Sequence, residues 1–195
     1  MGLNYSSIEA VFITHFHSDH IDGLGELSLF RWIGGQKREP LDVYGPEGID
    51  QVVNGFNVAY ELDSRYRNLH HGDDVADLNG YGMIPITFDM DEKIASTILF
   101  NDDGVKVEAF SVNHAPASPA VGYKISYKGR STVISGDTSK NKNLERNSKD
   151  VDLLIHSGLS PKLLKMMSTA ALQAGNNAQA KIFHDVLDYL SLIHI

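Results

Sequence analysis

The chain has 195 residues, which suffices for one sizeable domain or two small ones. Its 17 basic and 25 acidic residues give a net charge of −8, which argues against capture of nucleic acid by a broadly basic face. Cysteine is absent, so disulfides are excluded and any metal site must use histidine, aspartate or glutamate.

Membrane and targeting signals are missing from the sequence. No apolar run is long enough to cross a bilayer, and the first residues lack the basic-then-apolar order of a signal peptide. We therefore expect no membrane partner and, by default, a cytoplasmic protein, with a leader ahead of residue 1 as the alternative.

Strand-like and helix-like segments alternate along the first half of the chain. Apolar runs and helical periodicity predict a buried strand at 8–14, a helix at 23–33, a strand at 41–46 and a helix at 47–68. The second half is richer in strands, predicted at 83–90, 93–100, 105–112, 121–127, 131–135 and 151–156. The turns "NDDG" and "KG" predict hairpins, and helices are predicted at 160–174, with Ser160 as cap, and at 177–189. With no repeat and no low-complexity linker, residues 1–195 are interpreted as a single α/β (α+β) domain of mixed sheets flanked by helices.

The string "HFHSDH" at residues 15–20 follows the first predicted strand directly. Residues two apart on a strand share a face, so His15 and His17 are expected to project together and to bind one metal ion. Asp19 and His20, on the turn that follows, can bind a second ion beside the first. The alternative is an ordinary polar loop, and further ligands at other strand ends would decide between the two.

Two such residues occur later in the chain. His114 follows the predicted strand at 105–112, and Asp137 follows the one at 131–135 in "SGDT". Taken singly, His114 could be an exposed loop histidine and Asp137 a turn residue or a helix cap. Together with residues 15–20, both are better explained as metal ligands.

These motifs closely resemble the metallo-β-lactamase superfamily, and in particular its ribonuclease Z and arylsulfatase-like branch. The resemblance runs in order from about Ile8 to about Tyr189 and depends most on "HFHSDHIDGL" and "SGDT". It implies an αββα sandwich of two mixed sheets, incomplete at both ends, with a helical insert at 46–85 near the site. Strands that precede the first motif in the family are missing here.

The resemblance also implies roles for individual residues. One zinc ion would be held by His15, His17 and His114, a second by Asp19 and His20, and Asp137 would bridge the two. Asp19 would also orient the nucleophile. His156, in "LLIHSG", would lie near the metals as a proton donor or as an outer partner, although Ser157 replaces the glutamate of the family motif. A satisfied histidine at a strand end is the alternative for His156.

The C-terminal end departs from the family, which places a last zinc-binding histidine there. His194 in "LSLIHI" could imitate it, or residues 190–195 could be foreign to the fold, in which case the second zinc site is weakened. His70 and His71 either line the mouth of the pocket or lie at an exposed helix end, and His184 is expected to face solvent.

The predicted function is that of a di-zinc hydrolase that cleaves phosphodiesters or sulfate esters through a metal-bound hydroxide. The expected substrate is a small anionic ester or a nucleic-acid 3′ end, and the resemblance suggests a homodimer. Alternatives are thiolester or lactam hydrolysis by the same chemistry, or a metal-binding fragment without catalysis.

Overall fold

A computed structural model describes residues 4–90 and 94–189 of the chain. These residues form two compact units, Met1–Asp89 and Met90–Ile195, and each unit is described by itself. No helix in these two stretches is long and apolar enough to span a membrane. His194 and the rest of 190–195 lie outside the described residues, and both the single domain and the 46–85 insert remain predictions.

The first unit contains a three-stranded sheet with helices. Its elements in chain order are η1 (Tyr5–Ser7), β1 (Ala10–Phe12), α1 (Ser18–Ile21), α2 (Leu24–Gly35), β2 (Leu41–Pro46), α3 (Ile49–His71), α4 (Asp73–Ala76), η2 (Leu78–Gly80) and β3 (Met83–Phe88). The strands follow the order β1-β2-β3, and both pairings are parallel. The strand predicted at 83–90 therefore joins this sheet and not the hairpins that follow it.

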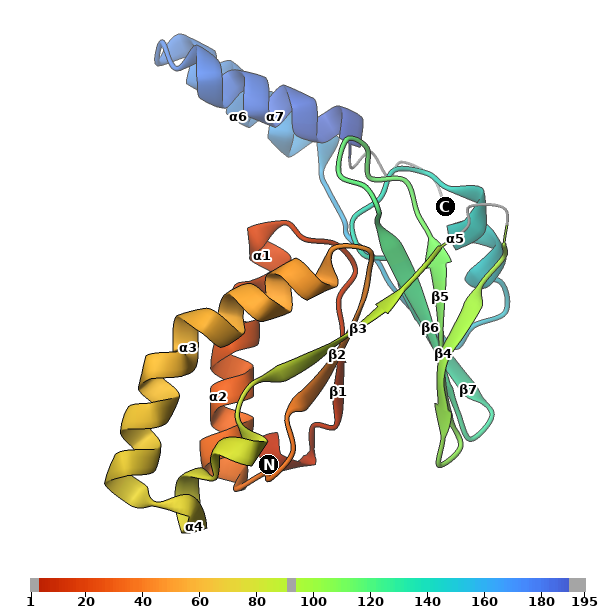
Figure 1. The fold of residues 1–195 in the computed structure, drawn as a ribbon. Helices are drawn as coiled ribbons and strands as arrows, with labels where there is room; N and C mark the ends of the chain where they lie inside the picture. The colour runs from red at the N-terminus through yellow and green to blue at the C-terminus, as the bar shows by residue number, and fades with distance from the viewer. Residues whose placement is uncertain (1–3, 91–93, 190–195) are drawn as a thin grey trace. The chain divides into compact units, whose positions relative to one another are not determined.

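Helices α2 and α3 cover one face of this sheet (Figure 1). Side chains alternate across a strand, so Leu41 and Val43 of β2 point to the same face, where both are fully buried. They pack with Leu24 of α2 and with Ile49 and Val53 of α3 in one apolar cluster. This packing fixes β1, and with it the chain that leaves its C-terminal end.

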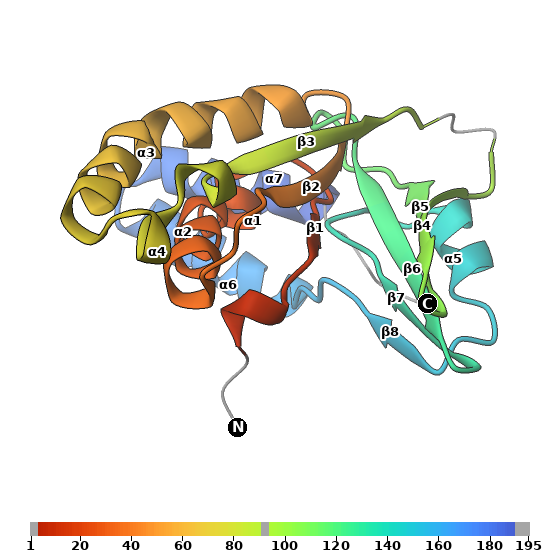
Figure 2. The same cartoon turned by 60° about the horizontal axis from the view of Figure 1, so that its bottom comes forward.

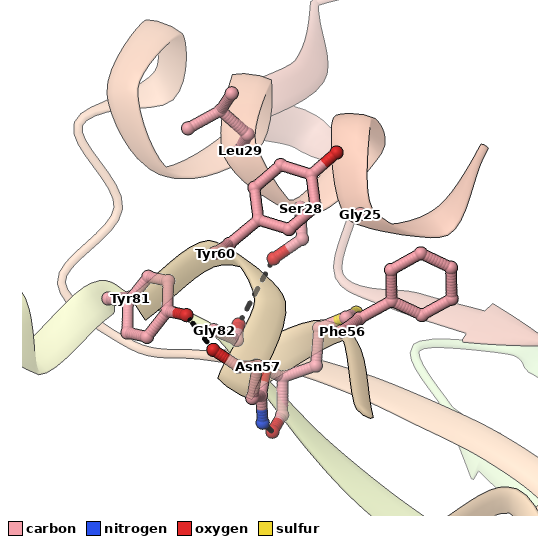
Figure 3. A pocket seen from close by; sticks show the side chains of 9 residues that line it. Gly25, Ser28, Leu29, Phe56, Asn57, Tyr60, Tyr81 and Gly82 are labelled. Carbon is pink, nitrogen blue, oxygen red and sulfur yellow. Dashed lines mark hydrogen bonds between the residues drawn. The ribbon is translucent and has the colours of Figure 1, made fainter. Parts of the chain in front are cut away.

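A small cavity of about 10 Å³ lies between α2, α3 and β3 (Figure 3). Hydrogen bonds tie its walls together: Ser28 Oγ donates to the Gly82 carbonyl over 3.3 Å, and the Tyr81 hydroxyl donates to the Asn57 carbonyl. The Asn57 side chain also exchanges two bonds with the Met83 backbone, at 2.9 and 3.0 Å. The cavity has room for about one water molecule, and the polar groups named here bond to one another. We therefore interpret it as a packing contact that stabilises the fold.

The described residues of the second unit form a five-stranded sheet and three helices. Its elements are β4 (Thr97–Asp102), β5 (Val105–Ser111), β6 (Val121–Tyr127), β7 (Arg130–Ile134), α5 (Lys142–Asn147), β8 (Leu153–Ile155), α6 (Pro161–Gln173) and α7 (Asn177–Tyr189). The strands lie in chain order, antiparallel from β4 to β7 and parallel between β7 and β8. This sheet is mixed, whereas the sheet of the first unit has parallel pairs only.

Local signals predicted the turns and caps of this unit correctly. Asp103 and Gly104 both have positive φ, at 48° and 78°, as the two-residue turn of a hairpin requires. Lys128 and Gly129 repeat the pattern at 47° and 75°. Ser160 caps α6 by accepting a hydrogen bond from the Leu163 amide at 3.3 Å. The predicted hairpins and the Ser160 cap are therefore confirmed.

Helix α5 packs on one face of the second sheet (Figure 2), where Phe110, Val133 and Leu144 are fully buried in a common cluster. Phe110 on β5 lies opposite Gly122 on β6. A Cβ atom built on Gly122 would come within 2.5 Å of Phe110 Cζ. The strand thus needs a glycine here, because the aromatic ring occupies the space of a side chain.

Gly122→Ala is therefore expected to destabilise the protein by about 1–3 kcal/mol, the usual cost of overpacking a core. The midpoint of urea unfolding should fall without a change in slope. Gly158→Ala is the matched control, because a Cβ there meets nothing within 4 Å. Equal midpoints for the two variants would contradict the packing argument.

Candidate metal centre

The first cluster of candidate residues lies where the chain leaves β1. That strand ends at Phe12, two residues earlier than the sequence predicted. The backbone stays extended beyond it, since the Ile13 amide donates to the Tyr44 carbonyl at 2.9 Å. His15 and His17 consequently lie on the loop beyond the strand, so the alternation of side chains along a strand does not explain why they lie close together. His17 occupies the cap position of α1.

The imidazoles of His15 and His17 nevertheless meet. His15 Nε2 lies 3.1 Å from His17 Nδ1, and His15 Nδ1 lies 3.1 Å from the Thr14 hydroxyl oxygen. The His15 side chain is only 1% exposed. A buried histidine whose one nitrogen is held by a hydroxyl, while the other faces a second imidazole, has the environment of a metal ligand.

The single turn α1 brings the other two residues of the motif to the same place. The ring centroids of His15 and His20 are 4.1 Å apart. Asp19 Oδ2 lies 3.5 Å from His20 Nε2, and the Asp19 side chain is 77% exposed. All four residues predicted from "HFHSDH" thus come together within the first unit, as three imidazoles and one solvent-facing carboxylate.

The second cluster is built by two loops of the second unit. His114 follows β5 and Asp137 follows β7, and the loops that carry them are joined by hydrogen bonds. The Asn113 amide donates to Thr138 Oγ1 at 3.1 Å, and the Ser139 amide donates to the Asn113 carbonyl at 2.8 Å. Thr138 is fully buried and His114 is 6% exposed. His114 and Asp137 each sit next to a residue of this joint, which holds their backbones side by side.

His156, just after β8, belongs to the same unit. Its Nδ1 lies 2.8 Å from Ser135 Oγ, which in turn lies 2.6 Å from the Gly136 carbonyl oxygen. When Ser135 donates its one proton to that carbonyl, His156 must donate from Nδ1, and its Nε2 then carries a lone pair. Nε2 is buried and has no hydrogen-bond partner among the described residues. The alternative of a satisfied histidine accounts for only one of its two nitrogens.

Burial lowers the pKa of His156 below its ordinary value, and the negative charge of Asp137 opposes this effect. The influence of Asp137 places the imidazole within electrostatic range of that carboxylate. The neutral form is favoured, with the open nitrogen on the side away from Ser135.

Ser135→Ala is expected to remove the preference of neutral His156 for the tautomer with its proton on Nδ1. Without its hydroxyl partner, Nδ1 should no longer hold the proton preferentially, and a mixture of the two neutral tautomers should replace one dominant form. Long-range ¹H–¹⁵N NMR correlations of the His156 ring measure the ratio directly. Ser157→Ala is the matched control, since Ser157 Oγ bonds the same Gly136 carbonyl at 3.3 Å but not the ring. An unchanged ratio in Ser135→Ala would contradict the role of the hydroxyl.

Sequence reasoning missed the residues that hold these side chains in place: Thr14, Ser135 and Thr138. Ser135 and Thr138 lie with Asp137 in the motif "SGDT", and Thr14 directly precedes the histidine string, but no contact was assigned to any of the three. The other candidate histidines of the described residues are exposed to solvent. His70 and His71 end α3 in exposed positions, and His184 on α7 is exposed.

Similar proteins come from several organisms. Ribonuclease Z of Mycolicibacterium gilvum is 28% identical over 169 residues, covering 86% of this chain and 56% of that protein. Ribonuclease Z of Mycobacterium marinum is 31% identical over 158 residues, covering 80% of this chain and 53% of that protein. The chain thus spans little more than half the length of these relatives.

Solved structures share the fold at low sequence identity. The short form of human tRNase Z has a TM-score of 0.57 and 24% identity, covering 86% of this chain and 64% of that one. YhfI of Bacillus subtilis, a metallo-beta-lactamase fold protein, has a TM-score of 0.51 and 18% identity, covering 79% and 52%. A profile of the metallo-beta-lactamase superfamily matches residues 2–176. This chain therefore belongs to the metallo-beta-lactamase superfamily.

Proposed function

We propose that this chain is a metal-dependent hydrolase that cleaves phosphodiester bonds of nucleic acid with two zinc ions. The main observation behind the proposal is that His15 Nε2 lies 3.1 Å from His17 Nδ1. The His15 imidazole is buried, and its other nitrogen lies within hydrogen-bond distance of the Thr14 hydroxyl. Membership of the superfamily and the ribonuclease Z relatives support the reaction class. Without those relatives, the donor set alone would support metal binding but not a substrate.

The donors present fit zinc, which takes imidazole nitrogen and carboxylate oxygen in sites without cysteine. We assign one ion to His15, His17 and His114, and the other to Asp19 and His20, with Asp137 shared between them. The second ion is then expected to bind more weakly, because fewer nitrogen donors hold it. Calorimetric titration of the metal-free protein with zinc should resolve one tighter and one weaker site.

When bound, a pair of zinc ions lowers the pKa of a water molecule and neutralises charge on the phosphoryl oxygens. The side chains of this chain supply the rest. Asp137 would be shared by both ions, and the hydrogen bond from the Asn113 amide to buried Thr138 supports the loop that carries it. Asp19, with its exposed carboxylate, orients the attacking water. In its protonated form, His156 would deliver the proton on Nε2 to the leaving oxygen and return to the neutral form with a lone pair on that nitrogen.

The favoured substrate is a nucleic-acid 3′ end, and a small anionic ester is the simpler alternative. A sulfate ester or a thiolester would use the same metal chemistry. Hydrolysis of bis(4-nitrophenyl) phosphate, a nitrophenyl sulfate and a thiolester by the zinc-loaded protein separates these classes. Turnover of the phosphodiester alone supports the proposal.

The decisive experiment measures metal content and phosphodiester turnover for the wild type and Asp19→Ala. About two zinc ions per chain with turnover in the wild type, and a loss of both the weaker ion and the turnover in the variant, is the expected result. A wild type that binds zinc and hydrolyses none of the three substrates would leave a non-catalytic metal-binding protein and refute the enzyme.

The expected homodimer remains a prediction. Val58, Leu62, Tyr66 and Leu69 are exposed at helical spacing on α3, which gives that helix an apolar stripe on its surface. Sedimentation velocity across a range of protein concentrations tests whether two chains associate.

A further inference from the structure

The second unit contains a hollow whose wall includes His114. Its volume is about 600 Å³, and it lies between the loop that follows β5 and the segment from Lys140 to Arg146. Any ligand bound there would therefore lie next to the proposed metal ligand. Lys140, Lys142 and Arg146 supply its charge, and we call this hollow the basic pocket.

The charge of the basic pocket contrasts with that of the chain. None of the described residues that line it is acidic, although the whole chain has a net charge of −8. Lys140 is paired with Glu145 at 3.5 Å. Lys142 and Arg146 make no ion pair within the part of the chain that the structure describes. Two exposed cations with no ion pair among the described residues, in a concave site lined by none of their carboxylates, favour an anionic ligand.

Two neutral side chains of the pocket already donate hydrogen bonds within the protein. The Asn143 side-chain amide donates to the Ser111 carbonyl at 3.3 Å, and the Asn113 side-chain amide donates to Ser139 Oγ at 3.0 Å. Recognition must therefore depend on charge more than on hydrogen bonds to a specific group. Contacts of this kind bind phosphates and carry no sequence information.

We propose that the basic pocket binds a phosphate of single-stranded nucleic acid next to the scissile phosphodiester. This inference rests on the proposed function, because the scissile group must lie at the metals beside His114. A substrate with a single phosphate does not reach the pocket, whereas an oligonucleotide does. The pocket thus distinguishes nucleic acid from small esters in a protein whose net charge is negative.

Binding of a fluorescein-labelled oligouridylate to the metal-free chain tests the pocket without turnover. The triple variant Lys140→Gln, Lys142→Gln and Arg146→Gln is compared with a control that removes three cations elsewhere, Lys128→Gln, Lys149→Gln and Lys165→Gln. We expect the pocket variant to bind about tenfold more weakly than the wild type and the control to bind nearly normally. The slope of log affinity against log salt should become shallower by about 0.7 for each phosphate that the variant no longer neutralises.

Equal weakening in both variants would show only the effect of net charge and would overturn the proposal, as would no weakening in either. Inorganic phosphate, added at constant ionic strength, separates the two sources of the anion. Saturable phosphate binding that needs the three cations, without any oligouridylate binding, would assign the pocket to free phosphate and also refute it.

Turnover separates this inference from the proposed function. With the zinc-loaded protein, the pocket variant should raise KM for the oligonucleotide about tenfold and leave bis(4-nitrophenyl) phosphate hydrolysis within about twofold. If the wild type hydrolyses neither substrate, the proposed function fails while the binding result still decides the pocket. An equal loss on both substrates would mean that these cations support the metal site and not a neighbouring phosphate.

Discussion

Replacing Asp137 by asparagine is expected to lower phosphodiester turnover by more than about 100-fold. Removal of an outer partner of a metal ligand typically costs about 10–100-fold, and a carboxylate shared by two ions should cost more. Asparagine keeps the size of the side chain but loses its negative charge. Turnover of bis(4-nitrophenyl) phosphate at saturating zinc, with metal content measured in parallel, gives the result.

Asp150→Asn is the matched control for this variant. Asp150 is an exposed carboxylate of the same unit with φ 57°, a conformation that asparagine also accepts. It should keep full turnover and full metal content. If Asp137→Asn retained more than a tenth of the wild-type turnover with two ions bound, the assignment of Asp137 as the shared ligand would be wrong.

Local patterns predicted most of the secondary structure because their causes are local. The turn Asp103-Gly104 and the Ser160 cap of α6 follow from the conformational preferences of a few adjacent residues. Helix α3 was predicted from 47–68 and observed at Ile49–His71, because its periodicity runs over many turns. The α/β class of mixed sheets flanked by helices follows from the same patterns, whereas the division into two sheets was implied by the family resemblance.

The pairing of strands that are far apart in the sequence could not be predicted from local patterns. β3 has the composition of the hairpin strands after it, yet it pairs with β2, because the packing of α3 decides its neighbour. The short helix α5 was not predicted, although it completes both the core around Phe110 and the basic pocket. Its six residues offer too short a periodicity to detect.

In the candidate site, too, the local sequence predicted some features, whereas others depend on contacts that it does not reveal. The types and spacing of His15, His17, Asp19 and His20 were enough to predict a cluster, and the first unit brings all four together. The groups that hold these and the later candidates could not be predicted, because Thr14, Ser135 and Thr138 act through hydrogen bonds of individual side chains. Such bonds depend on the orientation of one side chain and leave no periodic signal in a sequence.

His156→Gln is expected to lower kcat by about 10²–10⁴-fold, the usual contribution of a positioned acid or base, with zinc content unchanged. Glutamine can still form a hydrogen bond with Ser135 but cannot carry a proton to the leaving oxygen. Because burial lowers the pKa of His156, its protonated form disappears at a lower pH than for an exposed imidazole. Wild-type kcat should therefore fall as the pH rises through this lowered pKa, and the variant should lack that limb of the profile.

The same shift has a consequence for stability that does not depend on turnover. A histidine whose folded pKa is lowered favours the neutral form, so its stabilising effect is present above the unfolded pKa of about 6.5. That effect is lost as the pH falls through the folded value. His156→Gln should thus unfold with less sensitivity to acid than the wild type, whereas the exposed His184→Gln should match the wild type in both kcat and acid sensitivity. A His156→Gln variant with the wild-type pH profile would show that this imidazole neither carries the proton nor senses the buried site.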